Sequence, residues 1–230
     1  MTTETARSSG SPSGGEPRPS RVPPVRGTWR QYLAAVRVLA VLTVAVGVVY
    51  PLAITAVAHL PGLRGRAEGS LVHTASGAPV GSSLLGQGFV DRDGAPLPQW
   101  FQSRPSAAGD GWDGASSGAS NLGPTNPDLV SAIAQRRAAV AEFDSVPARQ
   151  VEPAQVPPDA LTASGSGLDP HISPAYARQQ VNRVALARGL DPARVGALVE
   201  DHVEGRILGF LGEERVNVLE LNLALLRLAP

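Results

Sequence analysis

The feature that most constrains this chain is an uninterrupted apolar segment close to its N-terminus. From Val38 to His59 the sequence contains no acidic or basic side chain except the terminal His59. As an α-helix this segment is about 31 Å long, which is enough to cross the hydrocarbon layer of a bilayer with little tilt. The sequence therefore predicts one membrane-spanning helix, which we assign to residues 32–59.

A cleaved signal peptide and a buried soluble helix are the alternatives to a membrane anchor. Ala56-Val57-Ala58 resembles the small-residue cleavage site of a secretory signal peptide. The apolar core of a signal peptide is only about 7–15 residues long, however, and a much longer arm precedes the segment here. A membrane anchor is therefore favoured over a signal peptide, and a helix buried in a soluble domain is less favoured still.

The arginines on either side of the span predict its orientation. Residues 1–37 contain two acidic residues and six arginines, which are Arg7, Arg18, Arg21, Arg26, Arg30 and Arg37. The segment just after the span has only Arg64 and Arg66 beside Glu68. Positive flanks stay in the cytoplasm, so the N-terminus is expected inside and residues 60–230 outside. Pro51, within the span, would kink the helix or leave a carbonyl free, which favours packing against partner helices.

The rest of the chain divides at the span. Residues 1–27 are rich in serine, glycine and proline without apolar periodicity, and we expect a disordered cytoplasmic arm over residues 1–31. Residues 60–230 are expected to form a single α+β extracytoplasmic domain, with strands concentrated before Pro105 and helices after Asn126.

Local signals in the domain predict its elements. Residues 70–74 and 80–89 flank Ala75-Ser76-Gly77-Ala78-Pro79, which is typical of a hairpin. Helices are expected over 128–143, from the N-cap Ser173 to Gly189, and from Asp191 to Gly205. Residues 215–228 mix strand-like alternation with a leucine-rich helical pattern, and either structure remains open.

Composition excludes several kinds of chemistry. All 20 basic residues other than histidine are arginine, and the chain has no cysteine. Without lysine there can be no Walker-A phosphate loop and no Schiff base, and without cysteine no thiol nucleophile or disulfide. The net charge is zero and the isoelectric point is about 6.9, so no nucleic-acid-binding footprint is expected.

Motifs that suggest catalysis do not form a complete site. Gly114-Ala115-Ser116-Ser117-Gly118 matches G-x-S-x-G, but no hydrophobic strand precedes it as a nucleophile elbow requires. A hydrolase using Ser116 is therefore a remote alternative. His73, His171 and His202 lack the spacing of metal ligands, so no metal site is expected, and His202 is expected to be a core histidine.

Constrained polar loops are the most distinctive feature of the domain. They combine proline, glycine and short polar side chains in the segments Trp100–Ala107, Ser117–Pro127 and Leu161–Pro174, and the chain closes with Arg215–Leu225. In these motifs and their order the chain strongly resembles the C subunits of Kdp-type potassium-transporting ATPases. The resemblance covers about residues 32–228.

The resemblance implies a non-catalytic subunit of a high-affinity, ATP-driven potassium uptake complex in the cell membrane. Its implied partners are a potassium-channel-like subunit, a P-type ATPase subunit and a small membrane peptide. ATP and potassium would act at the level of the complex, with no cofactor bound directly by this chain. A single-pass anchored assembly or adhesion module is the alternative from another functional class.

The family is also described as a catalytic chaperone that raises the ATP affinity of the hydrolytic subunit. That description implies nucleotide contacts at Ser117, Ser120, Asn121 and Gly123. The predicted topology conflicts with a direct contact, because ATP is cytoplasmic and this loop is expected outside. Assembly with the channel-like subunit is therefore the favoured role.

Eight polar loop residues are expected to be architectural or to face a partner. Arg104 precedes Pro105, which keeps its backbone extended, and its guanidinium can bridge several carbonyls or a carboxylate. The full set is Gln102, Ser103, Arg104, Ser120, Asn121, Asp169, His171 and Asn217.

Overall fold

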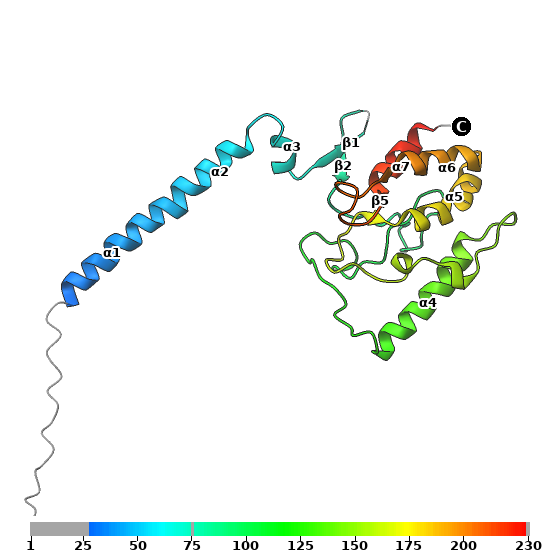
Figure 1. Cartoon of the computed structure of the whole chain (residues 1–230), viewed down its shortest axis with the longest axis horizontal. Helices are drawn as coiled ribbons and strands as arrows, with labels where there is room; N and C mark the ends of the chain where they lie inside the picture. Colours follow the sequence, from blue (N-terminus) through cyan, green and yellow to red (C-terminus); the bar gives the residue numbers. More distant parts are fainter. Residues whose placement is uncertain (1–27, 75, 229–230) are drawn as a thin grey trace, which may run out of the picture. The chain divides into compact units, whose positions relative to one another are not determined.

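The computed structural model describes residues 28–74 and 76–228, and the chain divides into two compact units at Val57/Ala58. The fold is α+β, as predicted: one N-terminal apolar helix and a separate domain of helices and short strands (Figure 1). Most of the expected arm, residues 1–27, lies outside the described residues. Residues 28–31, which the sequence assigns to the arm, are instead helical, because the first helix begins at Thr28.

The N-terminal helix runs from Thr28 to Ala58 and is long and apolar enough to cross a membrane. It consists of α1 (Thr28–Val44), a π-helical turn η1 (Ala45–Val49) and α2 (Tyr50–Ala58). The π-turn comes just before Pro51, which has no backbone N–H to donate to the preceding turn. The hydroxyl of Thr55 donates to the carbonyl oxygen of Pro51 at 2.8 Å.

The domain begins with the short helix α3 (Arg64–Ala67) and the predicted hairpin. Strands β1 (Leu71–His73) and β2 (Pro79–Ser82) pair antiparallel, with Leu71 opposite Ser82. The second strand is shorter than the expected 80–89. It ends at Ser82 because the Ser82 hydroxyl accepts a hydrogen bond from the backbone N–H of Leu84, which turns the chain.

The longer helices of the domain are α4 (Pro127–Asp144), α5 (Pro174–Arg188), α6 (Pro192–Asp201) and α7 (Val218–Arg227). The Ser173 side chain caps α5, and Gly189 ends it in the left-handed conformation with φ of 66°, as the sequence predicts. The expected end of α6 at Gly205 is wrong. The helix stops at Asp201 because residues 203–204 enter a sheet.

A three-stranded antiparallel sheet lies in the second half of the domain. Its order is β3 (His171–Ile172), β5 (Arg215–Asn217) and β4 (Val203–Glu204). The expectation that strands are concentrated before Pro105 is therefore wrong. The three later strands were not predicted because they are too short to show the alternating pattern of a strand. The ambiguous segment 215–228 contains both structures, a strand followed directly by α7.

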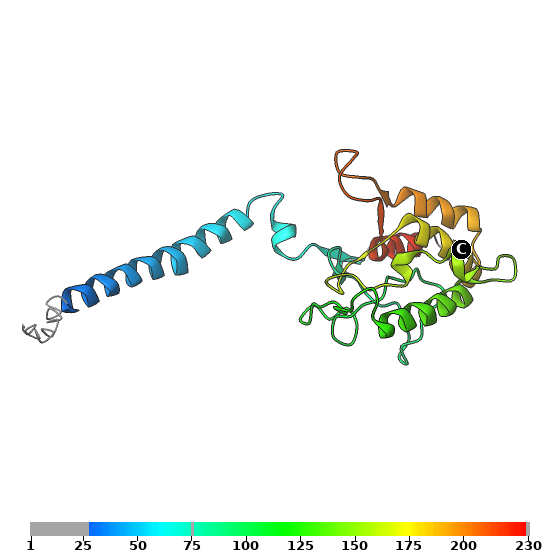
Figure 2. The ribbon, with the colours of Figure 1, turned by 60° about the horizontal axis from the view of Figure 1, so that its bottom comes forward.

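One apolar core connects these elements. Helix α5 packs on α6 and contributes Val184, while Val216 of β5 and Leu221 of α7 complete the centre; all three are fully buried. Helix α4 lies on the far side of the domain from α6 (Figures 1 and 2). Two 3-10 turns, η2 (Pro153–Gln155) and η3 (Pro158–Ala160), lead the chain from α4 back to β3. The loops that carry the predicted site residues are thus supported by one packed body.

Candidate functional site

Arg104 joins two of the constrained polar loops. Its Nε and Nη2 atoms each donate to the backbone carbonyl oxygen of Thr162 at 3.3 Å. Its Nη1 atom donates to Oδ2 of Asp169 at 3.2 Å. The guanidinium therefore contacts both a carbonyl and a carboxylate of the 161–174 segment, across 58 to 65 residues of sequence.

Asp169 is the centre of this cluster. Its Oδ1 atom accepts a hydrogen bond from the backbone N–H of His171 and lies 3.0 Å from Nδ1 of the same histidine. Partial burial would raise the pKa of the Asp169 carboxyl, but the hydrogen bonds from His171 and the charges of His171 and Arg104 outweigh it and lower the pKa. The carboxylate is therefore ionised at neutral pH and serves as an acceptor.

Two surface pockets meet at these three residues. One, of about 640 Å³, includes Leu84, Leu85 and residues 163–166, and the other, of about 560 Å³, includes residues 157–159 and 213–215. Arg104, Asp169 and His171 line both. The cluster therefore forms the wall between two concave surfaces, and it presents both signs of charge there.

Gln102 and Ser103, which precede Arg104, form hydrogen bonds with neighbouring segments of the chain. The Gln102 side chain donates to the carbonyl oxygens of Phe89 and Leu97 at 2.9 and 3.0 Å. Its backbone N–H donates to Oε1 of Gln180 at 2.7 Å. The Ser103 hydroxyl donates to the carbonyl oxygen of Gln87 at 2.8 Å, so both side chains are committed to shaping neighbouring loops.

Asn217 fixes the sheet to the hairpin. Its Oδ1 atom accepts the N–H of Glu220 at 3.2 Å and so caps α7, while its Nδ2 atom donates to the carbonyl oxygen of Ser83 at 2.8 Å. The residue is 4% exposed. The structure therefore gives Asn217 a position inside the domain.

The 117–123 loop packs on the 161–174 segment. The Ser117 hydroxyl and the Gly118 N–H both donate to the carbonyl oxygen of Ser166, at 3.1 and 2.9 Å. At Gly167 a Cβ atom would lie 2.7 Å from the Ala108 nitrogen, so only glycine fits this close approach. The expected nucleotide contacts Ser120, Asn121 and Gly123 are exposed, and Asn121 has a positive φ of 53°.

The G-x-S-x-G match begins with a turn and a bend at residues 114–116 and continues without regular structure through residue 118, and turns rather than a strand precede it. The strand–turn–helix arrangement of a nucleophile elbow is absent from this part of the described chain.

Two of the histidines line one small pocket elsewhere in the domain. A pocket of about 210 Å³ is lined in part by His73, His202 and Glu220. His202 ends α6, with its Nδ1 atom 2.8 Å from the carbonyl oxygen of Leu198. Across residues 28–74 and 76–228 no group of three histidine or carboxylate side chains is close enough to hold a metal ion.

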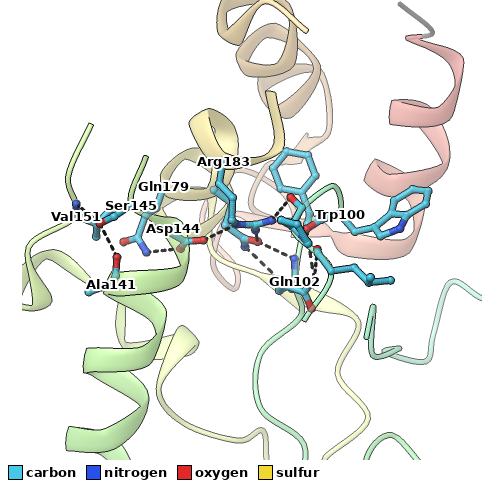
Figure 3. Close-up of polar contacts among 12 residues, drawn as sticks. Trp100, Gln102, Ala141, Asp144, Ser145, Val151, Gln179 and Arg183 are labelled. Carbon is cyan, nitrogen blue, oxygen red and sulfur yellow. Dashed lines mark hydrogen bonds and ion pairs between the residues drawn. The ribbon is translucent and has the colours of Figure 1, made fainter. Parts of the chain in front are cut away.

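Sequence reasoning missed a buried polar network around Arg183 (Figure 3). The guanidinium is 3% exposed; its Nε atom donates to Oδ1 of Asp144 at 2.8 Å, and its Nη1 atom donates to the carbonyl oxygen of Trp100 at 2.9 Å. Gln179 donates to the second carboxylate oxygen of Asp144 at 2.7 Å. The network links α4, α5 and the segment before Gln102. The sequence shows that α5 is a polar helix with strong caps at both ends, but neither feature indicates a buried network.

The comparisons identify relatives of the whole domain and helix. Residues 32–227 match the KdpC family, described as "K+-transporting ATPase, c chain". A protein of Kineococcus radiotolerans named "Potassium-transporting ATPase KdpC subunit" is 57% identical over 201 residues, covering 87% of this chain and 95% of its own length. Proteins with the same name from Mycobacterium tuberculosis and Streptomyces coelicolor are 48% and 47% identical, each covering 86% of this chain and, respectively, 99% and 93% of their own lengths.

Proposed function

This chain belongs to the KdpC family of potassium-transporting ATPase subunits, and from this premise we propose that it is a non-catalytic subunit that stabilises the assembled pump. Its partners in this proposal are the potassium-channel-like subunit, the P-type ATPase subunit and the small membrane peptide. ATP and potassium are bound by the complex, and this chain binds no cofactor of its own.

The observation that carries the proposal is the N-terminal helix. Between Arg37 and its end at Ala58 the helix Thr28–Ala58 contains no charged side chain, and none of its most apolar stretch is buried within the described residues. An exposed surface of this kind is stable only in lipid or against other apolar helices. In the proposed role the helix crosses the membrane and packs on helices of the partner subunits.

The domain supports a scaffolding role through the way its loops are fixed. The side chains of three loop residues form hydrogen bonds with carbonyl, carboxylate or amide groups of the same domain. These residues are Gln102, Arg104 and Asn217. Loops that are ordered before binding lose little entropy on association. Such loops suit a subunit that presents a fixed surface to a partner.

The proposed topology follows from charge. Six arginines precede the apolar segment, and a short basic flank is retained in the cytoplasm. The domain then lies on the extracytoplasmic side of the cell membrane, where it would contact the outer part of the channel-like subunit.

Co-purification tests the assembly role. The pump is extracted in mild detergent through an affinity tag on the channel-like subunit, with and without this chain. We expect the ATPase subunit and potassium-stimulated ATP hydrolysis to be recovered together only when the full chain is present. Recovery of an equally active complex without the chain would contradict the proposal.

The catalytic-chaperone role is the second candidate, and the exposure of the 120–123 segment favours it. Asn121 is exposed, and its side chain makes no hydrogen bond to another described residue. An Asn121→Ala pump should show a raised KM for ATP if this segment contacts nucleotide, and Asn126→Ala, which removes a helix cap instead, serves as the matched control. An unchanged KM in Asn121→Ala would exclude the contact.

A further inference from the structure

The segment between β4 and β5 exposes an apolar surface that the domain itself does not use. We call residues 205–214 the apolar loop. Leu208 is 80% exposed, Phe210 68%, Ile207 61% and Leu211 48%. Figure 2 shows this orange-brown segment projecting from the body of the domain. Four large apolar side chains together on one projection are unusual for a surface that faces only water.

The apolar loop has a defined shape before any partner binds. Ile207 and Leu211 exchange two backbone hydrogen bonds of 2.9 Å each, which closes the tip. Leu208 has a positive φ of 54°, a conformation that costs a leucine about 1–2 kcal/mol. Glycine or asparagine would adopt this backbone conformation at lower cost in free energy. The conformation of the turn therefore does not explain why residue 208 is a leucine.

The base of the apolar loop lies beside the point where the chain enters the domain. Val72 and His73 of β1 line the same pocket as His202, the residue that precedes β4. Ten residues, 59–68, separate the end of the apolar helix from Gly69, whose carbonyl is hydrogen-bonded to Ser82. Four of these residues, Arg64–Ala67, form α3, so a short and partly helical connector leads from the apolar helix to β1.

The charges around the apolar loop indicate the kind of partner. Arg206 precedes the apolar side chains, and Glu213 and Glu214 follow them, all exposed. At the base Arg215 pairs with Glu204 at 2.9 Å. An anionic lipid surface would attract the arginine but repel the two carboxylates. An apolar centre with a rim of both charges is instead the arrangement found at protein–protein interfaces.

We propose that the apolar loop docks into an apolar groove on a membrane-embedded partner subunit of the same potassium-transporting ATPase. Leu208 and Phe210 are the anchors, and Arg206 and the two glutamates meet groups of opposite charge at the rim of the groove. This inference rests on the proposed function, because it requires that the chain assembles with the pump.

The first test weakens the anchors without touching the fold. The double variant Leu208→Ser/Phe210→Ser in the full chain should associate with the solubilised pump at least about tenfold more weakly, as for two interface anchors. Leu186→Ser, which removes an apolar side chain that is 63% exposed on α5, is the matched control and should bind as the parent does. Equal melting temperatures of the three chains exclude misfolding.

The second test identifies the occupant directly. Because the chain has no cysteine, Phe210→Cys and Leu186→Cys each carry a single photoactivatable maleimide. We expect irradiation of the assembled pump to join position 210, but not position 186, to one partner subunit. Adducts with lipid alone, adducts between two copies of this chain, or equal labelling at both positions would each overturn the inference.

The outcomes also separate the two proposals. If the parent chain fails to assemble with the pump, the proposed function is contradicted. If the parent assembles and the double variant assembles equally well without a 210 crosslink, only the docking role of the apolar loop is contradicted.

Discussion

Arg183 differs from the other arginines of α5 in its surroundings. It is 3% exposed, pairs with a 1% exposed Asp144, and its guanidinium lies 4.4 Å from the centre of the Phe143 ring. Arg178, one and a half turns earlier, pairs with Glu200 at 2.7 Å, but both side chains are 53% exposed. The two pairs share their chemistry and differ mainly in burial.

Replacing these arginines should therefore have unequal effects. Arg183→Ala leaves the Asp144 carboxylate buried without its counter-charge, and we expect a loss of about 3–5 kcal/mol in the free energy of unfolding. Arg178→Ala removes an exposed pair and should cost less than about 1 kcal/mol. Denaturant unfolding of the full chain in detergent, followed by near-ultraviolet circular dichroism, measures both. Similar losses for the two variants would contradict the role given to burial.

Asp169 predicts a dependence of stability on pH. Its folded-state pKa is lowered, so the carboxylate stabilises the fold above the ordinary aspartate pKa near 4, and this contribution is lost as the pH falls through the lower folded value. We expect the difference in melting temperature between the parent and Asp169→Asn to shrink as the pH falls from about 6 towards 3. Asp110→Asn, which removes an exposed carboxylate, is the control, and a difference independent of pH would contradict the prediction.

At the residue scale the sequence carries information where the signal is local and little where the structure depends on packing. Pro105 indicated that Arg104 is held extended, and the structure has its guanidinium on Thr162 and Asp169. Nothing near Arg183 in the sequence indicates that its side chain is buried. The helical periodicity of 3.6 residues identifies the buried face of a helix from its apolar residues, and it gives no information about a buried arginine. The partners of Arg183 come from 39 and 83 residues away, and only the tertiary fold brings them together.

Among the helices, the glycines of α5 and α6 provide a test at the level of elements. Gly189 ends α5 with φ of 66°, whereas Gly196 lies inside α6 without a positive φ, and a Cβ there would meet Val181 at an ordinary 4.0 Å. Gly189→Ala should destabilise the domain by about 1–2 kcal/mol, and Gly196→Ala should stabilise it by roughly 0.5–1 kcal/mol. Thermal unfolding of the full chain checks the opposite signs, and a shared sign would refute the assignment of the cap.

The boundaries of helices and strands were predictable where neighbouring residues determine them, and not where they depend on contacts between distant segments. The starts of α5 and α6 follow from Ser173 and Asp191, each followed by proline. The three-stranded sheet was missed because its strands are two or three residues long and because β3 and β5 are separated in the sequence by α5 and α6. Segment 215–228 was ambiguous because it holds one strand and one helix without an intervening loop.

For the whole molecule, the central prediction is its orientation in the membrane. A cysteine at Ser166, on an exposed loop, should react with a membrane-impermeant maleimide in intact cells, and one at Ser13 should react only after lysis. The native chain gives no background, since it has no cysteine. The reverse pattern would bring the 117–123 loop to the side of cytoplasmic ATP and would favour the catalytic-chaperone role.

The π-helical turn Ala45–Val49 changes the phase of the N-terminal helix. A π-turn accommodates one extra residue, and each residue of an α-helix advances the side-chain direction by about 100°. The stripe of side chains that continues straight along α1 is therefore displaced by one sequence position in α2. A tryptophan scan of the helix in the assembled pump should reveal two periodic patterns of sensitivity, each with the spacing of an α-helix, out of step by one residue across positions 45–49.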